Sequence, residues 1–81
     1  MEVKVVLFAA LRDTVGQEEI RIAWCRGMTG QDVMGCLKQD FLSAGPLLNH
    51  ALIAVNGQYA EAGAFLMPGD EIAFLPPVSG G

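Results

Sequence analysis

The sequence predicts an α+β fold in which a mixed sheet of about five strands packs on one main helix. Apolar residues alternate in short segments near both ends of the chain, as they do in strands. One longer segment between them repeats its apolar residues at helical spacing, and turn signals separate the segments. The expected strands are residues 2–8, 18–24, 51–56, 58–60 and 71–75, and the expected helix is residues 29–42.

The first expected strand is apolar on both faces. Its alternating residues are Val3, Val5 and Leu7 on one side and Lys4, Val6 and Phe8 on the other. Because successive side chains of a strand point to opposite faces, this strand is expected in the centre of a sheet or against a partner. A short transition of one helical turn, residues 9–15, is expected to end at Gly16.

The second strand has one apolar face, formed by Ile20, Ile22 and Trp24. The helix after it has a clear start, because Thr29 is a suitable N-cap and Asp32 stands at the capping-box position. The stripe expected to face the core consists of Val33, Cys36, Leu37 and Phe41.

Glycines mark the weak points of the helix and the turns that follow it. Gly30 and Gly35 each weaken a helix by about 1 kcal/mol relative to Ala, so the helix depends on packing. Gly45-Pro46 is expected to end this region. Asn56-Gly57 predicts a type I′ turn, and Pro68-Gly69 a type II turn, since their central positions need positive φ.

The order of elements suggests a topology. The first two strands form a hairpin, the helix crosses over, and the last strand returns beside the first, which is a right-handed crossover between parallel neighbours. This is the β-grasp arrangement. A small ferredoxin-like domain or an irregular α+β domain is compatible with the same order.

Length and composition indicate one small domain with an exposed apolar patch. The chain has 81 residues, of which 52% are hydrophobic and 17% charged. Domains of this size bury only about 60% of their chain surface, so some apolar side chains are expected at the surface, where such patches mark partner sites. The net charge of −4 argues against nucleic-acid binding, which needs clustered Lys and Arg.

A cytoplasmic location without membrane contact is expected. The first residues alternate directly, as a secretory leader does not, and the apolar runs are far shorter than the roughly 20 residues of a membrane span. Cys25 and Cys36 lie eleven residues apart, which is no zinc or redox spacing. Both are therefore expected to be reduced structural thiols.

Conventional catalytic groups are missing from the pattern. His50 is the only histidine and is expected at the surface. The carboxylates of Asp70 and Glu71 are adjacent in sequence, so they diverge in a strand. The sequence has no nucleotide-binding or HExxH motif. The chain is therefore expected to be no enzyme by itself, with no metal and no permanently bound cofactor.

The end of the chain is the exception, and it divides the sequence into a domain of residues 1–75 and a tail of residues 76–81. The tail consists of Pro76, Pro77, Val78, Ser79, Gly80 and Gly81. Its prolines cannot extend the sheet and favour an extended path, and its last residues carry little or no side chain. Six residues reach up to about 20 Å, so the tail can enter a narrow channel in another protein. A frayed terminus is the alternative.

The carboxylate of Gly81 is the candidate reactive group. If it attacks the α-phosphate of ATP, it becomes an acyl-adenylate, from which AMP leaves readily. A sulfur nucleophile then forms a thiocarboxylate, and a nitrogen nucleophile forms an amide.

Three segments resemble the MoaD family, the small sulfur-carrier subunit of molybdopterin synthase. They are residues 5–12 with Gly16, residues 54–56 and residues 69–81. The last, from Gly-Asp-Glu to Pro-Pro-Val-Ser-Gly-Gly, is the most specific, because Gly-Gly alone would also fit ubiquitin and the thiamine sulfur carrier. Residues 24–50 carry no matching motif.

The resemblance implies a ubiquitin-like fold and three partners. An E1-like adenylyltransferase would activate Gly81 with ATP, and a sulfurtransferase would supply the sulfur. The tail would then enter the large subunit of molybdopterin synthase, within a heterotetramer, and its thiocarboxylate would give sulfur to cyclic pyranopterin monophosphate. The alternatives are a ubiquitin-like protein modifier, a sulfur carrier for thiamine or tRNA thiolation, and an interaction domain with an inert tail.

One face of the sheet is expected to dock these partners. Phe8 or Phe74, together with Leu75, is expected to lie partly exposed on the face opposite the helix. The sequence leaves the choice open, because a one-residue shift of register exchanges the two faces.

Overall fold

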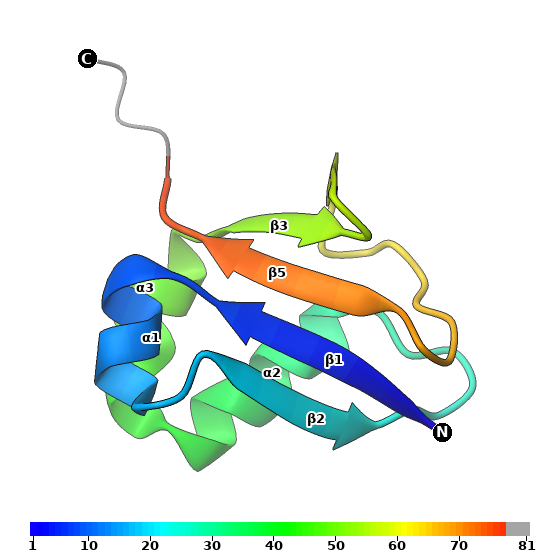
Figure 1. The fold of residues 1–81 in the computed structure, drawn as a ribbon, viewed down its shortest axis with the longest axis horizontal. Coiled ribbons are helices and arrows are strands. Elements are labelled where there is room, and N and C mark those ends of the chain that lie inside the picture. The colour runs from blue at the N-terminus through cyan, green and yellow to red at the C-terminus, as the bar shows by residue number, and fades with distance from the viewer. Residues whose placement is uncertain (78–81) are drawn as a thin grey trace.

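The computed structural model describes residues 1–77, which contain five strands and three α-helices (Figure 1). The strands are β1 (Glu2–Leu7), β2 (Glu19–Ala23), β3 (Leu52–Val55), β4 (Gln58–Ala60) and β5 (Glu71–Leu75). The helices are α1 (Ala9–Val15), α2 (Gly30–Asp40) and α3 (Gly45–Asn49), with a 3₁₀ turn, η1 (Leu42–Ala44), before α3.

The strands form one mixed sheet in the order β2-β1-β5-β3-β4. β1 pairs antiparallel with β2 and parallel with β5, and β3 pairs antiparallel with both β5 and β4. α2 crosses one face of this sheet, while α1 and α3 lie at the end where β5 leads out of it (Figure 1). The predicted β-grasp fold is confirmed.

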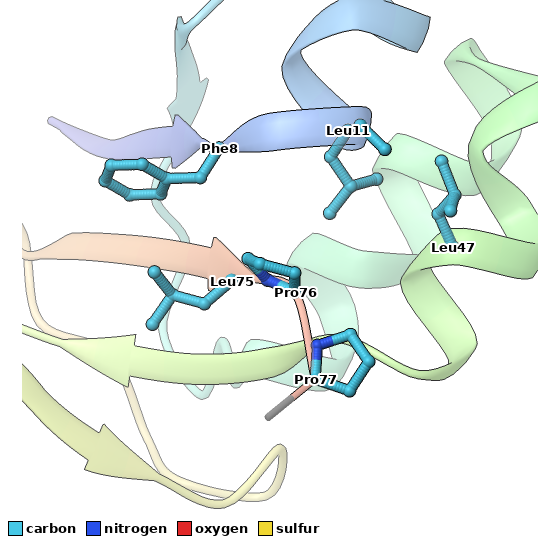
Figure 2. A pocket seen from close by; sticks show the side chains of 7 residues that line it. Phe8, Leu11, Leu47, Leu75, Pro76 and Pro77 are labelled. Atoms are coloured by element: carbon cyan, nitrogen blue, oxygen red, sulfur yellow. The ribbon is translucent and has the colours of Figure 1, made fainter. Parts of the chain in front are cut away.

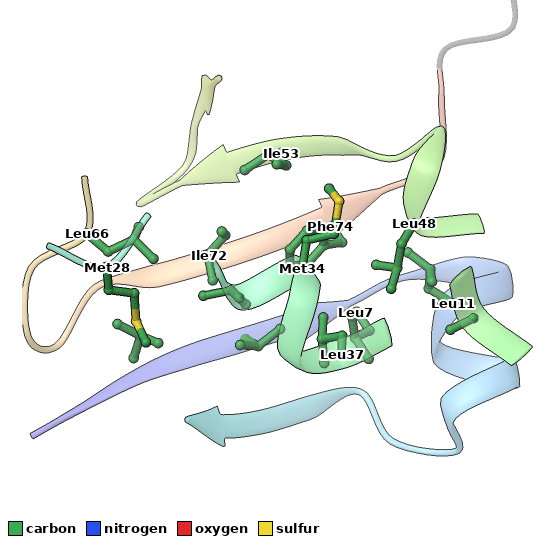
Figure 3. Close-up of a cluster of buried hydrophobic side chains, with 14 residues drawn as sticks. Leu7, Leu11, Met28, Met34, Leu37, Leu48, Ile53, Leu66, Ile72 and Phe74 are labelled. Carbon is green, nitrogen blue, oxygen red and sulfur yellow. The ribbon is translucent and has the colours of Figure 1, made fainter. Parts of the chain in front are cut away.

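The core lies between the sheet and α2 (Figure 3). The register pairs Val5 with Ile72 and Leu7 with Phe74, and all four side chains are at most 1% exposed. The buried residues of α2 are Gly30, Val33, Met34 and Leu37. Val33 and Leu37 agree with the predicted stripe, whereas Cys36 is half-buried and Met34 takes its place against the sheet.

The start of α2 has the predicted capping box. The amide of Asp32 donates to Thr29 Oγ1, and the amide of Thr29 donates to Asp32 Oδ2 at 2.9 Å. Gly30 has a role that the sequence did not reveal, since a Cβ there would lie 3.2 Å from the carbonyl oxygen of Ala62. The glycine lets the loop after β4 approach the first turn of the helix.

The helices at the far end of the core differ from the prediction. α1 has seven residues instead of a single turn, and it buries Leu11 before ending at Gly16, whose φ is +83°. Gly45-Pro46 does not end the helical region but begins α3, because Pro is well suited to a first helical turn. α3 buries Leu48 beneath the end of the sheet.

The two predicted turns are present. Asn56 and Gly57 both have positive φ, at +51° and +84°, as a type I′ turn requires, and Gly69 has φ +88°. The loop between β4 and β5 is held to the domain at Leu66, whose amide donates to Met28 O and whose carbonyl accepts from Trp24 Nε1 at 2.7 Å.

Candidate functional site

The site begins where β5 ends. Leu75 is the last strand residue, and Pro76 and Pro77 are exposed beyond it. Neither proline has an amide hydrogen for a neighbouring strand, which explains why the sheet stops here. The remaining site residues of the predicted tail, Val78, Ser79, Gly80 and Gly81, lie outside the described residues.

The face of the sheet away from α2 surrounds this exit. Glu71, Ala73 and Leu75 occupy it on β5, and each is half-buried. Phe8 continues the alternation of β1 in extended backbone and is 41% exposed. Phe8 and Leu75 therefore lie where a partner can reach them, as predicted, although their role in binding stays a prediction.

Phe74 does not belong to this surface. Its side chain is 0% exposed and packs in the core, so the expectation that it could contribute to a partner surface is wrong. The reason is the parallel register, which places Phe74 beside the buried Leu7 and fixes the parity that the sequence left open.

One half of the outer face is charged. Lys4 Nζ lies 3.3 Å from Glu71 Oε1 and 3.9 Å from Glu19 Oε2. Arg21 also lies between two carboxylates. Its Nη2 is 3.3 Å from Glu19 Oε1, and its Nη1 is 4.0 Å from Glu2 Oε1. Each basic group is thus placed between two carboxylates, and the charges of this half are largely neutralised within it.

The other half, toward the tail, is apolar and hollowed. The register aligns Val6, Ala73, Ala54 and Tyr59 across four adjacent strands, with Leu75 and Leu52 paired in the next row. The hollow has a volume of about 300 Å³. Its lining residues are Phe8, Ala54, Gly57, Tyr59, Glu71, Ala73 and Leu75.

A smaller apolar notch lies at the root of the tail (Figure 2), with a volume of about 40 Å³. It is bounded by Leu11 of α1, Leu47 of α3, and the two prolines, and it shares Phe8 and Leu75 with the hollow. The two depressions therefore form a continuous apolar surface around the point where the chain leaves the sheet.

The part of the chain that the structure describes contains no candidate metal site. No group of three or more His, Cys, Asp or Glu side chains there could hold a metal ion. Asp70 has a structural role, because Oδ2 accepts from the amide of Met67 and Oδ1 accepts from Asn56 Nδ2. His50 is exposed and both cysteines are free, as predicted. Cys36 is half-buried, whereas Cys25 is exposed and does not have the expected structural position.

Among residues 1–77, no helix is long and apolar enough to span a membrane.

The β-grasp fold with the strand order β2-β1-β5-β3-β4 places the chain in the class of ubiquitin-like proteins. The ThiS family model matches residues 5–81. The chain therefore belongs to the ThiS family. Its relatives include molybdopterin synthase sulfur carrier subunits, in agreement with the predicted resemblance to the MoaD family.

Two relatives match this chain over nearly its whole length. The chain is 32% identical over 81 residues to the molybdopterin synthase sulfur carrier subunit of Arabidopsis thaliana, covering 100% of this chain and 84% of the relative. It is also 32% identical over 83 residues to small archaeal modifier protein 1 of Haloferax volcanii. This match covers 93% of this chain and 95% of the relative.

Solved structures share the fold over the full length. The crystal structure of SAMP1 from Haloferax volcanii aligns with a TM-score of 0.85 at 27% identity, with 100% of both chains covered. A chain in the complex of subunits 1 and 2 of the molybdopterin-converting factor from Helicobacter pylori aligns with a TM-score of 0.73 at 27% identity, again with 100% of both chains covered. Fold and relatives together support a ubiquitin-like sulfur carrier, a class of small protein that generally acts as a non-catalytic subunit.

Sequence reasoning missed the hollow. No sequence pattern marks Ala54, Ala73 or Tyr59 as the lining of a hollow, because two of them are small and the third lies in a three-residue strand. The Asn-Gly turn did contain a usable signal, since a two-residue hairpin loop places Tyr59 opposite Ala54.

Proposed function

We propose that this protein is the sulfur-carrier subunit of a molybdopterin synthase. Gly81 is adenylated, receives sulfur as a thiocarboxylate, and donates that sulfur to cyclic pyranopterin monophosphate. The observation that carries the proposal is the position of the tail root, where Pro76 and Pro77 leave the sheet beside the exposed Phe8 and the half-buried Leu75. A docked partner can hold this surface and take up the tail at the same time.

The chemistry on Gly81 balances with partners supplying the reagents. The glycine carboxylate attacks the α-phosphate of ATP, and pyrophosphate leaves. The outer sulfur of a persulfide on a sulfurtransferase then attacks the acyl carbon, and AMP leaves, which gives an acyl disulfide. A second thiol attacks the sulfurtransferase sulfur of that disulfide, so that the thiocarboxylate is released and the two thiols are left joined as a disulfide. The carrier contributes the carboxylate. Because its sequence has no nucleotide-binding motif, we propose that an E1-like adenylyltransferase binds the ATP.

The large subunit of the synthase is the proposed acceptor of the tail. A complex of subunits 1 and 2 is known for the Helicobacter pylori relative. In the proposed heterotetramer, formed in the cytoplasm, each carrier docks through Phe8 and Leu75. Val78, Ser79 and Gly80 enter the large subunit, where small side chains allow a narrow passage.

Intact mass spectrometry tests the proposal. The chain is incubated with an E1-like enzyme, ATP and a sulfurtransferase system, and its mass should increase by the replacement of one oxygen by one sulfur at Gly81. The chain alone should catalyse no ATP–pyrophosphate exchange. Failure of sulfur to appear at Gly81 under conditions where the enzyme forms the adenylate would contradict the proposal.

A second candidate is a protein modifier, favoured by the 32% identity to small archaeal modifier protein 1. In that case a lysine amine displaces AMP from the adenylate, and Gly81 ends in an isopeptide bond. Expression of a tagged chain in the source organism distinguishes the two functions. A modifier yields a series of larger conjugates on a gel, and these conjugates persist under reducing conditions. A thiamine or tRNA-thiolation carrier would form the same thiocarboxylate but would fail to restore molybdopterin synthesis.

A further inference from the structure

We propose that the hollow beside the tail is a socket for one bulky apolar side chain of the large subunit, and that Ala54 and Ala73 on its floor determine whether that side chain fits. The inference deepens the proposed function and rests on it, because it specifies how the carrier recognises the protein that takes up its tail.

The sheet register creates the socket. Ala73 on β5 pairs with Ala54 on β3, so two adjacent central strands present methyl groups at the same level. Their neighbours in the row are larger, since Val6 flanks Ala73 and Tyr59 flanks Ala54. Adjacent strands lie about 4.8 Å apart, so β1 and β4 are separated by about 14 Å across the two alanines.

The walls of the socket are apolar and accessible. Tyr59 is 73% exposed and Phe8 is 41% exposed, and Leu75 closes the end nearest the tail. Glu71 is the one charged lining residue, and its carboxylate already has Lys4 at 3.3 Å. A side chain entering the socket therefore meets aromatic and methyl surface, which favours an aromatic or large aliphatic group over a charged one.

Continuity with the tail root indicates that the occupant is a protein that takes up the tail. Of the two such partners proposed above, we commit to the large subunit, because a complex of subunits 1 and 2 is known for a protein of the same fold at 27% identity. Phe8 and Leu75 line both the socket and the notch that borders Pro76 and Pro77. Leu75 is bonded directly to Pro76, so no linker separates the socket from the tail. A protein anchored in the socket thus holds the root of the tail in one position, which is what the acceptor of the tail requires. Buried aromatic anchors of this kind commonly carry much of the energy of an interface.

Filling the socket distinguishes it from a featureless apolar patch. Ala73→Leu adds apolar surface to the outer face, so a simple patch would bind its partner as well as before or more tightly. If the hollow is a socket, the added side chain occupies the space that the partner's side chain needs. We therefore expect binding to the large subunit to weaken at least tenfold, or by about 1.4 kcal/mol. Ala54→Leu fills the same floor from β3 and should have the same effect.

Ala23→Leu is the matched control. Ala23 is exposed on the edge strand β2, on the same face and opposite Glu2, so the change adds the same atoms outside the socket. The probe is the large subunit of molybdopterin synthase from the same organism, titrated calorimetrically with each full-length variant. Thermal unfolding checks that each variant is folded, and Ala73→Val supplies a smaller filling if Ala73→Leu lowers stability.

The outcomes separate the socket from the proposed function. Weak binding by Ala73→Leu and Ala54→Leu, with unchanged binding by Ala23→Leu, supports the socket. Unchanged binding by all three folded variants overturns the socket and leaves the proposed function standing. A wild-type chain that accepts no sulfur at Gly81 and does not bind the large subunit overturns both.

Discussion

Phe8, the residue directly after β1, and Phe74 of the neighbouring strand β5 point to opposite faces of the sheet. Phe74 is 0% exposed and opposes Leu7 in the parallel register, whereas Phe8 is one residue further on and is 41% exposed. Side-chain alternation alone separates them. One phenylalanine therefore belongs to the core, and the other belongs to the surface around the tail.

This separation predicts opposite effects for two alanine substitutions. Phe74→Ala should lower the free energy of unfolding by about 3–5 kcal/mol, since it leaves a cavity between the sheet and α2. Phe8→Ala should lower it much less but should weaken binding to the large subunit at least tenfold. Urea denaturation and calorimetric titration measure the two quantities separately.

Leu42→Ala is the control for this pair. Leu42 is 82% exposed and lies in η1, away from the outer face, so neither stability nor binding should change. The assignment would be wrong if Phe74→Ala kept wild-type stability, or if Phe8→Ala and Leu42→Ala bound the large subunit equally well.

Much of the fold was predictable because local chemistry determines it. Thr29 and Asp32 define the start of α2 wherever the helix packs, and Asn56-Gly57 requires a tight turn in any context. The last strand ends at Leu75 because two prolines follow. The tail was visible for the same reason, since its prolines and glycines act through their own backbones.

The parts that were not predictable depend on tertiary pairing. Whether Phe74 or Leu75 faces the core depends on the register of β5 against β1, and no local signal specifies it. Ala54 and Ala73 form a hollow only because β3 and β5 are neighbours. Pro46 can end one helix or begin another, and packing of Leu48 into the core favours the second outcome here.

The hydrogen bond from Trp24 Nε1 to Leu66 O predicts a local role for the indole. It joins residues 42 positions apart and holds the loop before β5 against β2. Trp24→Phe keeps an aromatic ring but leaves the carbonyl without its donor, so stability should fall by about 1–3 kcal/mol. The amide of Leu66, which donates to Met28 O, should then exchange its hydrogen faster. Unchanged exchange at Leu66 would show that the loop is held by packing alone.

The two glycines of α2 should respond differently to alanine. An added Cβ at Gly35 meets nothing within 4 Å, so Gly35→Ala should stabilise the protein by up to about 1 kcal/mol through helix propensity. Gly30→Ala places its Cβ 3.2 Å from Ala62 O and should gain less or lose stability. Chemical denaturation of both variants measures the difference. Equal stabilisation by both would show that the loop at Ala62 moves away at little cost.

The ion pairs on the charged half of the outer face should contribute little to stability. Lys4 lies between Glu19 and Glu71, but its side chain is 37% exposed, and solvent screens such pairs. Lys4→Gln should therefore change the free energy of unfolding by less than about 1 kcal/mol. Denaturation at low and at high salt checks this, and a large loss that salt abolishes would contradict it.

The last prediction concerns the tail itself. Deleting Gly81 removes the carboxylate that the proposed function uses, and Gly80→Leu adds a side chain where a narrow passage is proposed. The buried core found among residues 1–77 extends along the chain only to Phe74, and chain termini contribute little packing. Tm should therefore stay within error of the wild type.

The two tail variants should fail at different steps. The chain without Gly81 should yield no sulfur transfer to the pterin precursor. Gly80→Leu should still bind the large subunit through Phe8 and Leu75 while losing transfer, because docking and tail insertion involve separate residues. Thermal unfolding, calorimetric titration and a molybdopterin assay measure the three properties. Continued sulfur transfer by the chain without Gly81 would contradict the proposal that this residue carries the sulfur. Loss of binding by Gly80→Leu would show instead that the tail, and not the sheet, provides most of the affinity.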